Sequence, residues 1–120
     1  MTTLRDQRDK RLGLNEALFR DVNERLEELG ESFGMGDEQT DFVCECANPA
    51  CTERIAMTLD EYEHVRADPT HFAVRPGHIE AEIEVVLAEN ERFLLVEKRD
   101  PDSVRVVERL DPRSRSHAAE

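Results

Sequence analysis

The segment "FVCECANPACTERI", residues 42–55, contains all three cysteines of the chain, at positions 44, 46 and 51. Its two ends are typical of short strands, and Asn48-Pro49 between them is typical of a turn. Because side chains alternate along a strand, Cys44 and Cys46 are expected on one face, and Cys51 returns to that face across the turn. The segment therefore predicts a hairpin that brings three thiols to one place.

Three thiols at one place suggest a metal site, because Zn²⁺ prefers four thiolate or imidazole ligands arranged as a tetrahedron. We predict His78 as the fourth ligand, since it follows the turn pair Pro76-Gly77, which exposes the next side chain outside regular structure. The predicted zinc site consists of Cys44, Cys46, Cys51 and His78. The other candidates for the fourth ligand are His71, which begins a predicted strand, His64, which lies in a predicted helix, and the carboxylates of Glu45 and Glu53.

Other interpretations of the cysteines remain open at this stage. Reduced cysteines also pack as small apolar residues, and clustered thiols also serve in redox chemistry. An iron–sulfur cluster would require a fourth cysteine, which this sequence does not contain. Four protein ligands would make the zinc site closed and structural, whereas catalysis would require an open position and a base such as Glu45 or Glu53. Because the deaminase, phosphate-loop and metalloprotease motifs are absent, we predict that the chain is not an enzyme.

Composition limits the remaining functions. With 120 residues the chain is expected to form one domain, and with 38% hydrophobic residues its core is small enough to benefit from a metal cross-link. The net charge of −12 argues against direct binding to nucleic acids or anionic membranes. The sequence contains neither a long apolar run nor an apolar signal core, so we expect a soluble, cytoplasmic protein whose thiols stay reduced.

Residues 5–29 carry the pattern of an amphipathic helix, and Gly30 stands where a C-terminal cap is expected. We predict a partner-binding or dimerising helix, in which Asn15 would fix the register; a homodimer through this helix is one expectation. The alternative is an ordinary helix packed on its own domain. The predicted contact positions, at heptad spacing, are Leu12, Asn15, Phe19, Val22, Leu26 and Leu29.

Residues 30–41 are rich in glycine and acidic residues and are predicted to be a flexible acidic linker, which would make the helix a mobile or swapped arm. The module of residues 42–110 would then hold the zinc site. The residues from 111 to 120 are polar and are predicted to be a disordered tail.

Within the module, Thr58 and Glu61 form a capping box that predicts a helix ending near Asp68-Pro69. Strands are expected in "THFAV", residues 70–74, and in "RFLLVEK", residues 92–98, which is apolar enough to be central. Residues 79–90 fit either a helix or a strand; the helix is favoured, with Asn90 as its cap. The segment "SVRVVERL", residues 103–110, would add an edge strand or a turn of helix. The predicted fold class is α+β: a small domain of short antiparallel strands and two helices, cross-linked by zinc and preceded by an amphipathic helix.

Three segments resemble a family of short actinobacterial proteins: "NEALFRDVNERLEEL", "FVCECANPACTERIAMTLDEYEHVRADPTHFAVRPGH" and "RFLLVEKR". The resemblance covers residues 8–98. It implies a small standalone protein in which the helix, the cysteine cluster and the P-G-H turn occur together. On that pattern Cys44, Cys46, Cys51 and His78 match the cysteine and histidine positions of the family. The resemblance implies no activity or substrate.

The sequence as a whole predicts a zinc-binding protein that acts as a non-enzymatic protein–protein interaction or regulatory module. Its negative charge suits a basic surface on a protein partner, for example in the transcription or signalling machinery. One alternative is a thiol-redox or metal sensor that uses the same cysteines. The other is a metal-dependent enzyme related in chemistry to hydrolases or deaminases.

Overall fold

The computed structural model describes residues 4–35, 38–46 and 48–113 of the chain. This part forms an α+β fold with three helices and two small antiparallel sheets. One sheet has the order β1-β2 and the other has the order β3-β5-β4. The elements are α1 (Leu4–Ser32), β1 (Thr40–Val43), β2 (Arg54–Met57), α2 (Leu59–Val65), β3 (His71–Val74), β4 (Glu84–Glu89), β5 (Leu94–Lys98) and α3 (Pro101–Arg109).

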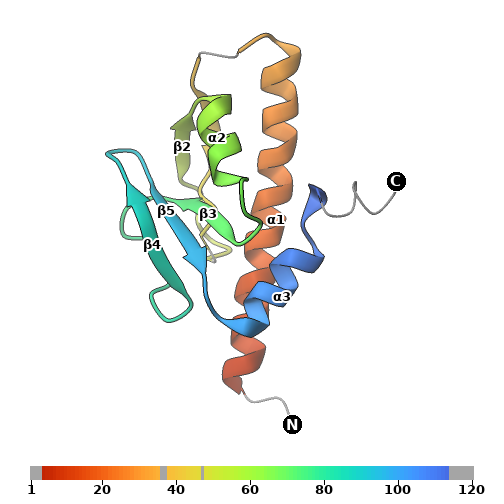
Figure 1. Cartoon of the computed structure of the whole chain (residues 1–120), viewed down its shortest axis with the longest axis vertical. Coiled ribbons are helices and arrows are strands. Elements are labelled where there is room, and N and C mark those ends of the chain that lie inside the picture. Colours follow the sequence, from red (N-terminus) through yellow and green to blue (C-terminus); the bar gives the residue numbers. More distant parts are fainter. Residues whose placement is uncertain (1–3, 36–37, 47, 114–120) are drawn as a thin grey trace.

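The helix α1 runs along the longest axis of the molecule (Figure 1). The helix α2 lies beside its C-terminal half and α3 crosses its N-terminal half, while β1 also packs against it. The crossing is close at Gly13, where an added Cβ would lie 3.2 Å from Cβ of Val106 and 3.3 Å from the backbone of Ser103. A side chain at position 13 would therefore push the two helices apart.

Several local predictions are confirmed. The hairpin pairs β1 with β2, and Phe42 lies opposite Ile55. The helix α2 begins after Thr58, whose side chain accepts a hydrogen bond from the Glu61 backbone while the Glu61 side chain accepts one from the Thr58 backbone. The strand β5 is central in its sheet, as its apolar sequence indicated. These features depend on short-range signals, which is why the sequence reveals them.

The helix favoured for residues 79–90 is wrong. Glu84–Glu89 form β4, which pairs with β5 and has an irregularity in register between Val86 and Ala88. Asn90 does not cap a helix; its side chain accepts hydrogen bonds from the backbone N–H groups of Arg92 and Phe93 in the β4–β5 turn. Pairing with a neighbouring strand decides the ambiguous pattern here. The segment after β5 is a helix, α3, capped by Asp100 and with Pro101 in its first turn.

The boundaries proposed for the linker and the tail also change. The helix α1 extends to Ser32 and β1 begins at Thr40, so the connection between them is shorter than the predicted linker, and residues 36 and 37 lie outside the described residues. The helix is not a detached arm, because it packs on β1, α2 and α3. Asp111 is buried against Arg66, so the predicted tail begins with ordered residues; residues 114–120 lie outside the described part.

The apolar core lies between the hairpin, α2 and the second sheet. Phe42 and Tyr62 stack with ring centroids 4.6 Å apart, and both side chains are fully buried. Tyr62 also donates a hydrogen bond from its hydroxyl to Glu24 of α1, at 2.8 Å. Each large side chain buried in this way contributes about 2 kcal/mol to folding. The core thus joins the two sheets and ends at a polar contact with α1.

The face that α1 turns inward is polar, which reverses the usual arrangement of a surface helix. Glu16 contacts the buried Lys98, whose ammonium also lies 2.8 Å from Glu84. Burial raises the pKa of Glu16 well above its ordinary range, whereas the pKa of Glu84 is lowered: its burial is outweighed by the hydrogen bond with Glu16 and the charge of Lys98. The charge of Lys98 is therefore balanced by the ionised carboxylate of Glu84, while Glu16 retains its proton. The buried polar residues on this face are Glu16, Arg20, Asn23 and Glu27.

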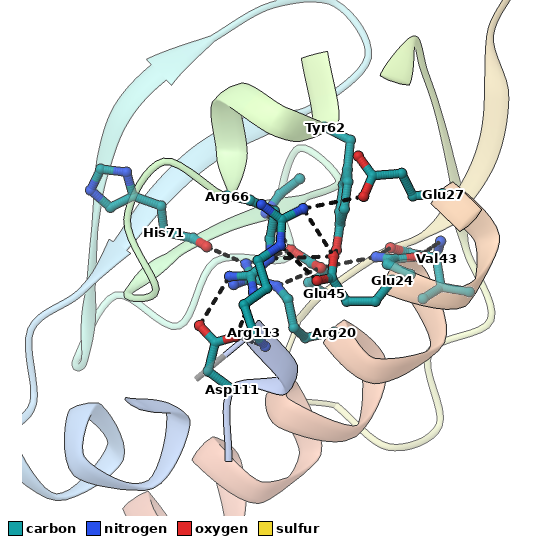
Figure 2. A network of polar contacts seen from close by, with 12 residues as sticks. Arg20, Glu24, Glu27, Val43, Glu45, Tyr62, Arg66, His71, Asp111 and Arg113 are labelled. Atoms are coloured by element: carbon teal, nitrogen blue, oxygen red, sulfur yellow. Dashed lines mark hydrogen bonds and ion pairs between the residues drawn. The ribbon is translucent and has the colours of Figure 1, made fainter. Parts of the chain in front are cut away.

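Near the C-terminal half of α1, one arginine binds three carboxylates. Arg113 lies 2.7 Å from Glu24 and 3.2 Å from Glu27 (Figure 2). It also contacts Glu63. Burial and the neighbouring Glu63 carboxylate raise the pKa of Glu27 to about 8. The folded chain therefore holds a proton on Glu27 that the unfolded chain releases near its ordinary pKa of 4.5.

This raised pKa predicts a loss of stability as the pH rises from about 4.5 to about 8, because over this range the folded state binds the proton more tightly than the unfolded state. Glu27→Gln should flatten that part of the stability curve. It should raise the free energy of unfolding at pH 8 by about 1–2 kcal/mol, a value reduced for partial exposure to solvent. Urea denaturation at several pH values measures the effect. Glu28→Gln, an exposed neighbour on α1, is the matched control, and parallel curves for all three proteins would contradict the prediction.

Candidate metal centre

The hairpin positions the three cysteines. Cys44 follows β1 directly, and its backbone N–H donates to the carbonyl of Glu53 at 3.0 Å, which extends the β1–β2 ladder by one step. Cys44 and Cys46 are buried and Cys51 is half-buried, so one side of the cluster lies near solvent. Between the first two cysteines, Glu45 points to the opposite side, toward α1, as strand alternation requires.

The turn after β3 brings His78 to the cysteines. The backbone N–H of His78 donates to the carbonyl of Arg75 at 2.9 Å, and Gly77 has φ +87°, a left-handed conformation that favours glycine. The resulting position places Nδ1 of His78 3.6 Å from Sγ of Cys44 and 3.5 Å from Sγ of Cys51. One ligand atom from each of the four predicted residues lies within 4.8 Å of the other three.

These separations suit a tetrahedral zinc ion. With Zn–S of about 2.3 Å and Zn–N of about 2.0–2.1 Å, a tetrahedral angle sets the S···N separation at about 3.6 Å. The two measured S···N distances lie close to this value. The four side chains lie close together and could bind a metal ion.

A backbone N–H group supports the sulfur of Cys44: that of Arg75 donates to its Sγ at 3.2 Å. The nearby backbone at Asn48 and Glu53 favours the thiolates of Cys46 and Cys51, which offsets part of the rise in the pKa of each. A hydrogen bond from the Cys46 thiol, together with the Arg75 N–H, lowers the pKa of Cys44. The pKa of Cys46 is raised by the same thiol–thiol hydrogen bond, and burial raises that of Cys51. These backbone groups would stabilise thiolates once a metal displaced their protons.

The other candidate ligands lie elsewhere. His71 pairs with Glu97 at 3.0 Å across β3 and β5, where Asp68 also lies nearby. His64 is exposed on α2, with its Nδ1 3.0 Å from the carbonyl of Asp60. Glu53 is exposed to solvent. Among the residues considered from sequence, the structure therefore brings His78 to the three cysteines.

Glu45 has a structural role that the sequence analysis did not identify. Its carboxylate is fully buried and forms two hydrogen bonds with the Arg20 guanidinium, at 3.0 and 3.1 Å (Figure 2). It also accepts hydrogen bonds from Asn23 and from the backbone N–H of Ala73, each at 3.0 Å. One carboxylate therefore joins the cysteine hairpin to α1 and to β3. The sequence contained a signal for this role: a residue between two cysteines that share one face of a strand must point to the opposite face.

The helix α1 contacts the same hairpin through Asn23. Its side-chain amide donates to the carbonyl of Val43 at 3.0 Å and accepts from the Val43 N–H at 2.8 Å. Both bonds copy those that a neighbouring strand would make to β1. The backbone that leads into Cys44 is therefore held from the side by α1.

A pocket of about 290 Å³ lies beside the cluster. Cys46 and His78 line one part of it, and Asn48, Ile79 and Glu80 line the rest. Because His78 and Cys51 are only half-buried, small molecules can approach this side of the cluster.

Comparison with protein-family models, curated proteins and solved structures finds no match for this chain. In the part of the chain that the structure describes, no helix is long and apolar enough to cross a membrane.

The buried carboxylate between the cysteines generates a stability prediction. Glu45→Gln should lower the free energy of unfolding by about 3 kcal/mol, because the buried Arg20 loses the charge that balances it. Chemical denaturation followed by circular dichroism measures the change. The control is Glu53→Gln, an exposed glutamate in the same hairpin, which should change stability by less than about 0.5 kcal/mol. Equal effects of the two substitutions would refute the role assigned to Glu45.

Proposed function

We propose that this chain is a zinc-binding protein in which zinc has a structural role. The observation that carries the proposal is the convergence of three thiols and one imidazole, with His78 Nδ1 at 3.5 and 3.6 Å from two of the sulfurs. Sulfur ligands favour zinc over magnesium, calcium or manganese, and a tetrahedral S₃N set is a common structural zinc site.

The structural role follows from which segments the ion would connect. The three cysteines belong to the β1–β2 hairpin, whereas His78 lies between β3 and β4 of the other sheet. Zinc bound to all four would therefore link the two sheets. With four protein ligands no coordination position is left for water, so the metal would add its binding free energy to folding.

We further propose that the folded chain acts as a non-enzymatic interaction or regulatory module. Exposed apolar side chains on α1 and directly after it support this role, since they include Leu18 at 61% and Phe33 at 77% exposure. The net charge of −12 favours a partner with a basic surface, for example in the transcription or signalling machinery. A cytoplasmic location and membership of the actinobacterial family stay predictions.

A second candidate function is a thiol-redox or metal sensor. It is supported by the half-buried positions of Cys51 and His78 beside the 290 Å³ pocket, which allow an oxidant to approach the sulfur atoms. A metal-dependent enzyme is the third candidate and would require one of the four ligands to leave the ion for water.

The metal content of the purified protein tests the proposal. We expect about one zinc per chain by inductively coupled plasma mass spectrometry. Cys44→Ser should lose the zinc, and its melting temperature should fall by roughly 10–20 °C, because metal binding contributes to folding. His78→Ala should weaken zinc binding, whereas His64→Ala and His71→Ala, which remove histidines outside the cluster, should not.

The same preparation separates the three candidates. A metal-free chain that melts cooperatively and does not respond to a chelator would refute the zinc proposal. Release of zinc by micromolar peroxide, reversed by a thiol reductant, would favour the sensor. The absorption spectrum of the Co²⁺-substituted protein distinguishes four-coordinate S₃N binding from a site that holds additional water, which would favour the enzyme.

A further inference from the structure

The outward face of α1 carries a continuous row of apolar side chains. They recur at intervals of four, four, seven and four residues, which places them on one side of a helix. Phe33 lies just beyond α1, and its N–H donates to the Leu29 carbonyl at 3.1 Å, so the last helical turn includes it. We call these residues the apolar stripe: Leu14, Leu18, Val22, Leu29 and Phe33, with exposed fractions of 49, 61, 39, 54 and 77%.

The stripe overlaps the predicted contact positions only at Val22 and Leu29. Leu12, Asn15 and Phe19 are half-buried, and Leu26 packs against the apolar core. The positions predicted from the heptad pattern therefore lie along one edge of the exposed face of α1, and only Val22 and Leu29 belong to the stripe.

Rotation of α1 cannot bury the stripe within the chain. The opposite face is held by the Arg20–Glu45 ion pair and by the contact of Glu16 with Lys98, all of them buried. Turning the helix inward would leave the buried charges of Arg20 and Glu45 unpaired, at about 3–5 kcal/mol, and would also remove Glu16 from its contact with Lys98. The stripe is therefore fixed on the outer surface of α1, where a partner can reach it.

We propose that the partner is a second copy of this chain, bound through α1 in antiparallel orientation. This inference rests on the proposed interaction role and not on the metal.

The first argument is the spacing of the stripe about Val22. Leu14 lies eight residues before it and Leu29 seven after; Arg11 and Phe33 each lie eleven away. A two-fold interface requires such symmetry, because residue i of one copy must meet residue j of the other and the reverse.

The pairing follows from that spacing. With the two-fold axis near Val22, the Val22 side chains of the two copies meet, and Leu14 packs on the partner's Leu29. Phe33 lies against Arg11 of the partner subunit, where the exposed guanidinium can cover the ring. Leu18 lies against the aliphatic part of the partner's Arg25, which is exposed on the same side of the helix.

The second argument is charge. The exposed basic residues Lys10 and Arg11 lie near the N-terminus of α1, while Glu28 and Glu31 are exposed near its C-terminus and no basic residue occupies the last turn. This distribution is unfavourable for an isolated helix, because it adds to the charges of the helix dipole. An antiparallel partner sets each acidic end beside a basic end, whereas a parallel partner would set the acidic ends together.

The size of the contact indicates a reversible dimer. From Arg11 to Phe33 the helix is about 33 Å long at 1.5 Å per residue. A single pair of helices of this length forms a small interface, and each chain also has a net charge of −12. We expect a dissociation constant in the micromolar range.

Sedimentation equilibrium of the full, metal-loaded chain tests the dimer over about 5–200 µM, a range chosen to include a micromolar dissociation constant. We expect the mass to approach twice 13.8 kDa at the upper end. Leu18→Glu and Leu29→Glu should raise the dissociation constant at least about tenfold, because they place a charge in the contact. Leu87→Glu, which changes an exposed leucine of β4, is the matched control and should leave the dimer intact.

A photo-crosslinker at position 33 tests the orientation. Replacement of Phe33 by p-benzoylphenylalanine should give an intermolecular crosslink to the peptide that contains Arg11; a crosslink near position 33 would contradict the antiparallel arrangement. A chain that remains monomeric at about 200 µM would overturn the dimer. An equal increase in the dissociation constant for Leu18→Glu and Leu87→Glu would also overturn the dimer. Zinc content and circular dichroism, measured on every variant, separate this outcome from failure of the metal proposal or of folding.

Discussion

The ion pair between Arg20 and Glu45 connects the parts of this molecule. Arg20 belongs to the first helix, and Glu45 belongs to the hairpin that carries the cysteines; both side chains are almost completely buried. The Arg20 guanidinium also lies 4.1 Å from the ring centroid of Phe72 in β3 and donates a hydrogen bond to the carbonyl of His71. The positions of α1, the hairpin and β3 are therefore tied together by a few directional contacts.

Directional contacts specify a geometry more strictly than apolar packing does. A buried ion pair contributes little net stability compared with apolar residues of the same size, but the loss of one partner is costly. An α1 helix docked through Arg20, Asn23 and Glu16 therefore has one permitted rotation and one permitted register. The same constraint keeps Leu14, Leu18 and Leu29 on the outside of the molecule. The polar inner face of α1 and its apolar outer face therefore have one cause.

The parts of the fold that the sequence predicted depend on near neighbours. The cysteine hairpin, the Thr58–Glu61 capping box and the Gly77–His78 turn are each formed by residues close together in the sequence, where alternation, capping and turn chemistry act. The turn also explains why His78 was distinguishable from His64 and His71.

The parts that escaped prediction depend on residues distant in sequence. Residues 84–89 are a strand because β5 pairs with them, and their own pattern also fits a helix. The inward face of α1 was not found because the usual rule searches for apolar residues, whereas this face is charged. Asp111 looked like part of a polar tail because Arg66, its partner, lies 45 positions earlier.

The unequal spacing of the four candidate metal ligands has a consequence for the order of folding. Cys44, Cys46 and Cys51 are brought together by a short hairpin, whereas His78 reaches them only after 27 further residues have been arranged. Closing the longer loop costs more chain entropy, and the difference grows with the logarithm of loop length. If a metal binds, the hairpin could therefore hold it through three thiols before α2 and β3 have formed. Coordination by the imidazole would require α2 and β3 to be in place, so the coordination number would increase with native structure.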